Sequence, residues 1–110
     1  ALLANSVYEF EAVMISGSTT NETQYSLRYS AAGASIAAAA IVGGSSLSGQ
    51  RISAFNTATP TTAVVNAIVL IKGIVTTGAN PGNLIGQVRN FNNGPAIVQT
   101  NSFLKVTKIS

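Results

Sequence analysis

The chain has 110 residues, of which 46% are hydrophobic and only 8% are charged, and its formal net charge is +3. It contains no His, Cys, Trp or Asp and only three Glu. Thiolate or imidazole metal sites and the usual Ser-His or Cys-His nucleophiles are therefore excluded, and no cofactor is expected. The Lys and Arg residues are scattered without interleaved aromatic residues, a pattern that does not favour nucleic-acid binding. The length is that of a single domain.

The first two predicted strands show the alternation of half-buried β-strands. Residues 6–15 place four apolar side chains on one face, where they are expected to point into a core: Tyr8, Phe10, Ala12 and Met14. Residues 23–29 repeat this pattern with Tyr25, Leu27 and Tyr29. A polar, turn-rich loop over residues 16–21 is expected to separate the two strands.

Residues 31–44 are ambiguous, because the run 37–40 consists of four alanines, the best helix former. Glycines bound the segment at Gly33 and at Gly43 and Gly44, no capping box precedes it, and it ends in a β-branched pair. A strand of small residues packed closely against a neighbour is therefore predicted, and far-UV circular dichroism is expected to show little helix. A loop over 45–50, a short strand over 51–55 and another loop over 56–62 are predicted to follow.

Residues 63–75 (AVVNAIVLIKGIV) would be apolar on both faces of a strand. A helix competes for a run of this length, but Val and Ile dominate and Gly73 interrupts it. The run is shorter than the ~20 residues of a membrane-spanning helix, so membrane insertion is not expected. A strand that is apolar on both faces has to be covered on both. We therefore predict a central strand with one face buried against another subunit.

Three further strands are predicted towards the C-terminus, over 83–91, 96–100 and 102–109, with turns around Pro81 and Pro95. Seven or eight short strands at about 8–12-residue spacing predict an all-β fold, an antiparallel β-sandwich or jelly roll. The residues expected to be buried, in its core or at a trimer interface, are Tyr8, Phe10, Val69, Ile71 and Phe103.

Two sets of side chains are candidates for catalysis or ligand binding, and each also has a purely structural explanation. Glu9 and Glu11 would share a strand face about 7 Å apart, which overlaps the separation of a glycosidase pair. Cross-strand ion pairs with Lys or Arg explain the same two residues. Tyr8, Tyr25 and Tyr29 can form a sugar-stacking platform, but strand alternation places the last two in a core or interface. No catalytic, cofactor-binding or metal-binding residue is assigned, and the protein is not expected to be an enzyme.

Residues 3–12 (LANSVYEFEA) resemble the L-x-A-N-T-x-Y-x-F-E-A strand of a domain found in structural proteins of tailed phages and prophages. Residues 101–109 (NSFLKVTKI) resemble the terminal strand of that domain, and Ile71, Gly73 and Val75 match its central I-x-G-x-V strand. The two ends also resemble the broader C1q/TNF-type trimeric jelly roll. The resemblance extends over nearly the whole chain and consists of hydrophobic and turn positions.

The resemblance implies a homotrimeric β-knob on a virion surface, a non-enzymatic structural protein that decorates a capsid or forms the head of a tail fibre. The expected partners are further copies of the chain and capsid or fibre-shaft proteins. The alternative is a receptor- or glycan-binding tip of a phage fibre or of a bacterial trimeric adhesin, with loops such as 16–21 and 45–50 contacting host-surface glycans. One or two strands usually precede the first motif in that family, so residues 1–110 are expected to form one sandwich that lacks upstream strands of a longer parent.

Overall fold

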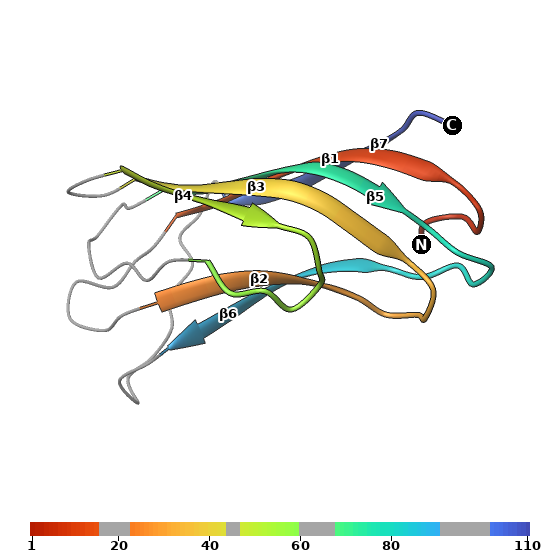
Figure 1. Cartoon of the computed structure of the whole chain (residues 1–110), viewed down its shortest axis with the longest axis horizontal. Coiled ribbons are helices and arrows are strands. Elements are labelled where there is room, and N and C mark those ends of the chain that lie inside the picture. Colours follow the sequence, from red (N-terminus) through yellow and green to blue (C-terminus); the bar gives the residue numbers. More distant parts are fainter. Residues whose placement is uncertain (16–22, 44–46, 60–67, 91–101) are drawn as a thin grey trace.

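In the computed structural model the chain forms antiparallel strands arranged in two sheets (Figure 1). The structure describes residues 1–15, 23–43, 47–59, 68–90 and 102–110. Its strands are β1 (Val7–Ile15), β2 (Thr23–Tyr29), β3 (Ser35–Gly43), β4 (Leu47–Ile52), β5 (Ile68–Thr76), β6 (Leu84–Asn90) and β7 (Phe103–Lys108). No helix occurs within the described ranges. The predicted all-β fold is confirmed, and the two layers form an antiparallel β-sandwich.

The larger sheet has five strands in the order β4-β3-β5-β1-β7, and β2 and β6 form the smaller one. Figure 1 shows the pair β2 and β6 beneath the larger sheet. The prediction of a central strand is confirmed, because β5 has β3 on one side and β1 on the other. Its described part begins at Ile68, and residues 63–67 of the predicted strand lie outside the described residues.

The core lies between the two sheets and is built by alternate residues of each strand. In β1 and β2 these are the residues that the alternation predicts, and Phe10 and Tyr25 are each only 1% exposed. In β5 the inner residues Val69, Ile71 and Val75 are fully buried. Successive side chains of a strand point to opposite faces, so the intervening residues of β1 and β5 form the outer face of the larger sheet.

The alanine run lies in β3, as predicted, and its strand pairs with both β4 and β5. The predicted loop over 45–50 was wrong for residues 47–50, because β4 already begins at Leu47. The predicted strand over 51–55 ends earlier, at Ile52. The sequence of the polar segment Leu47–Gln50 does not by itself predict a strand. Backbone pairing with β3, from Gly43 opposite Leu47 onwards, holds it in the sheet.

Gly73 lies at a point where β5 and β3 approach closely. It pairs with Phe10 of β1 and with Ala38 of β3. A Cβ at position 73 would lie 2.5 Å from the Ala38 Cα and 2.6 Å from the Ala38 Cβ, distances that real Cβ atoms do not show. Only glycine fits there without a shift of β3 against β5.

The smaller sheet is bordered on its β2 side by the chain that follows β4. The Asn56 amide donates to the Leu27 carbonyl at 2.8 Å, and the Thr59 amide donates to the Tyr25 carbonyl at 2.9 Å. The buried Thr59 hydroxyl in turn accepts from the Tyr25 amide at 3.0 Å. These bonds occupy the second edge of β2. On the other side β6 pairs only with β2 within the described part of the chain.

Candidate interaction surfaces

The outer face of the larger sheet, turned away from β2 and β6, carries a row of apolar side chains. The register aligns Ile41 of β3 with Leu70 of β5. It then aligns Leu70 with Val13 of β1, and Val13 with Phe103 of β7. The two ends of this row are well exposed, Ile41 by 48% and Phe103 by 49%. Four neighbouring strands therefore present a continuous apolar stripe to their surroundings.

The next row of the same face adds Ile15 and Ile68, which are paired with each other. Ile68 is 50% exposed. We call these residues the apolar patch: Val13, Ile15, Ile41, Ile68, Leu70 and Phe103. The three half-exposed members together expose on the order of 300 Å², before the partly exposed members are added. Apolar patches of this size on a protein surface are often functional.

Both described carboxylates lie on this outer face, beyond the apolar patch. The register places Glu11 directly opposite Lys72 of β5 and Lys105 of β7. Glu9 faces the same way, as predicted, and with Glu11, Lys105 and Thr107 it lines a shallow depression of about 130 Å³. A glycosidase pair has to flank a sugar bond in a binding cleft. Carboxylates that stand beside lysines on an open sheet face favour the cross-strand ion pairs instead.

Both edge strands of the larger sheet carry exposed cations. In this sheet β4 contains Arg51, and β7 contains Lys105 and Lys108. Charged side chains on an edge strand hinder backbone pairing with a strand of another chain. Association of copies through sheet faces and side-chain contacts is therefore favoured over edge-to-edge pairing.

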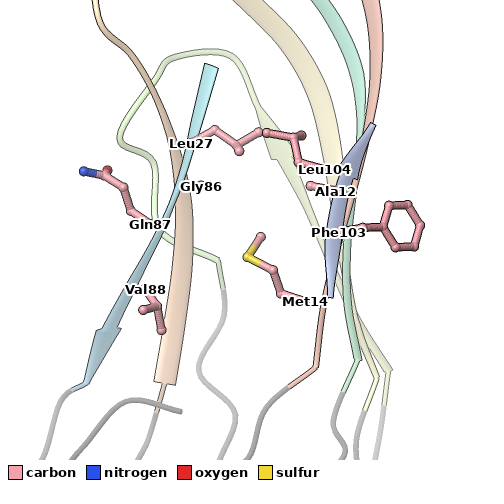
Figure 2. Close-up of a pocket in the computed structure, with 8 residues that line it drawn as sticks. All are labelled: Ala12, Met14, Leu27, Gly86, Gln87, Val88, Phe103 and Leu104. Atoms are coloured by element: carbon pink, nitrogen blue, oxygen red, sulfur yellow. The ribbon is translucent and has the colours of Figure 1, made fainter. Parts of the chain in front are cut away.

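An apolar pocket of about 190 Å³ opens between the two sheets on the side of β6 and β7 (Figure 2). Its lining is contributed by both sheets and is mostly apolar: Ala12, Met14, Leu27, Gly86, Gln87, Val88, Phe103 and Leu104. Leu104 pairs with inner-facing Ala12, and Val88 pairs with inner-facing Tyr25, so both belong to the interior side of their strands. Even so, Leu104 is 38% exposed and Val88 is 40% exposed. Within the described residues, the sandwich is open along this side.

Part of this pocket is empty because Gly86 has no side chain to fill it. Gly86 pairs with the buried Leu27 and thus faces the interior, yet a Cβ at position 86 would meet no atom within 4 Å. The pocket is smaller than the roughly 300 Å³ of common small-molecule sites and lacks their convergent polar groups. An apolar cavity of about 150 Å³ is large enough for benzene. The pocket therefore suits one aromatic ring or branched aliphatic group and does not suit a sugar or a nucleotide.

All three tyrosines are buried, so the sugar-stacking platform is wrong for them. Tyr8 is 6%, Tyr25 1% and Tyr29 8% exposed. The Tyr8 hydroxyl accepts a hydrogen bond from the Leu3 amide at 2.8 Å. Burial, and secondarily the neighbouring Tyr8, raises the pKa of the Tyr29 phenol above its ordinary value of 10.0. These rings serve the core, as the strand alternation indicates for Tyr25 and Tyr29.

The predicted buried residues divide between the two sides of the larger sheet. Tyr8, Phe10, Val69 and Ile71 are at most 6% exposed, whereas Phe103 is half exposed. The prediction that Phe103 lies in the core of the chain is wrong, and its ring points away from the smaller sheet (Figure 2). Pairing with Val13 puts Phe103 on the outer face, and Leu104 takes the inner position. A contact between Phe103 and another subunit stays a prediction.

Two features of these surfaces were not predicted from the sequence. One is the pocket, whose lining is assembled from strands far apart in the chain. The other is Ile41, which the alternation with the buried Val42 would have assigned to an outer face once residues 35–43 were accepted as a strand.

No family model matches the chain, and no curated protein and no solved structure matches it either. The described residues contain no group of three or more potential metal ligands among His, Cys, Asp and Glu. In the same part of the chain, no helix is long and apolar enough to cross a membrane. The apolar patch and the pocket are thus the features from which a function can be argued.

Proposed function

We propose that this domain is a non-enzymatic structural protein that forms a homotrimeric jelly-roll knob on a virion surface, as a capsid decoration or as the head of a tail fibre. The apolar patch carries the self-association. The virion setting and the number three are supplied by the resemblance of residues 3–12 and 101–109 to phage structural proteins.

The apolar patch supports association for a physical reason. Burial of apolar surface is favourable by roughly 25 cal/mol per Å², and the part of this gain that exceeds the entropy cost of association appears as affinity. Because the patch spans β3, β5, β1 and β7, it is also rigid before binding, which reduces the entropy lost on association. Closed rotational symmetry is the usual way in which identical chains cover such a surface.

The other classes of function have less support. The glycosidase hypothesis needs a cleft around Glu9 and Glu11, and these residues lie on an open face next to Lys105. The glycan-binding alternative has less support because the three tyrosines are buried in the core and cannot form a stacking platform. Of its two loops, 16–21 lies outside the described residues and stays a prediction for an adhesin tip, whereas residues 47–50 of the loop predicted over 45–50 lie in β4.

Light scattering coupled to gel filtration tests the proposal with one charge placed in the apolar patch. The wild type is expected to show about three times 11.2 kDa, and Ile41→Glu is expected to show a lower mass, because a buried unpaired charge opposes association. Ile41 is suitable because it is half exposed, whereas Ile71→Glu would unfold the chain from its core. Ala79→Glu, with the same charge on the exposed β5–β6 connection, is the control and should remain trimeric. A wild-type monomer at micromolar concentration would refute the proposal.

A further inference from the structure

We draw no further inference here: the strongest candidate, the apolar pocket between the two sheets on the side of β6 and β7, opens between two strands that are joined by residues 91–101, which lie outside the described residues, and nothing in the structure shows what covers it.

Discussion

Replacing Gly73 by alanine probes a close approach between β5 and β3 in the larger sheet. The glycine lies in the middle of the central strand β5, between Phe10 of β1 and Ala38 of β3. An added methyl group would lie 2.6 Å from the Ala38 Cβ and 2.5 Å from the Ala38 Cα. One of these atoms belongs to the backbone, so rotation of a side chain does not relieve the overlap. The strands have to separate locally.

Whether Gly73→Ala raises or lowers the free energy of unfolding depends on two opposing contributions. A Gly→Ala change that the fold accommodates stabilises a protein by about 0.4–1 kcal/mol, because the unfolded chain has fewer conformations. Inserting a methyl group into a well-packed interior costs about 1–3 kcal/mol, and occasionally more. At position 73 the second term exceeds the first, and we expect a net loss of about 1–3 kcal/mol. In a domain of this size that corresponds to a melting temperature lower by roughly 5–20 °C.

Urea unfolding followed by circular dichroism measures this loss, with all variants at one protein concentration so that assembly contributes equally. Gly49→Ala is the matched control. Gly49 is an exposed strand glycine whose nearest neighbour to an added Cβ is the Ala40 carbonyl oxygen at 4.0 Å. It is expected to be as stable as the wild type or slightly more stable. Equal free energies of unfolding for Gly73→Ala and Gly49→Ala would refute the close approach of β3 and β5.

Two further predictions concern the core between the sheets. Phe10→Ala should lower the free energy of unfolding by about 3–5 kcal/mol, because a ring that is 1% exposed leaves a cavity behind; a loss below about 1 kcal/mol in urea unfolding would place the ring at the surface. Tyr29 should ionise above its ordinary pKa of 10.0 in a spectrophotometric titration of the folded protein. Since the folded state holds this proton more tightly than the unfolded state, its stabilising contribution is complete below pH 10.0 and is lost as pH rises through the raised pKa. Tyr29→Phe should flatten that decline, and an unchanged pH dependence would contradict the assignment.

The inner residues of several strands could be read from the sequence because each strand contrasts its two faces. In β1 one face is entirely apolar and the other carries Glu9 and Glu11, so the direction of Phe10 follows from the cost of burying charge. In β2 the same contrast between Arg28 and its apolar neighbours decides the burial of Leu27. The alanines of β3 were recognised as a strand from the flanking glycines, against their own propensity.

The apolar character of β5 on both faces was also evident from the sequence, and it placed this strand at the centre of a sheet. Lys72 shares a face with Ile68 and Leu70, so the cost of burying a charge indicates that Val69 and Ile71 face the core, as predicted. The pattern does not show how much of the apolar surface on the Ile68 face stays exposed. That depends on the strands and loops that pack around β5, and the tertiary structure leaves Ile68 half exposed.

In β7 both faces mix apolar residues with lysine, so alternation pairs Phe103 with Lys105 and Leu104 with Lys108 without indicating which pair turns inward. The register against β1 decides it: Phe103 opposite Val13 faces outward, and Leu104 opposite Ala12 faces the second sheet. The pocket beside Gly86 is likewise a property of the assembled sheets, since its lining is drawn from β1, β2, β6 and β7. The sequence by itself determined the strands and the contrast between their faces, because these depend on neighbours along the chain. The facing of β7, the apolar patch and the pocket depend on which strands pair and in which register, and only the tertiary structure decided them.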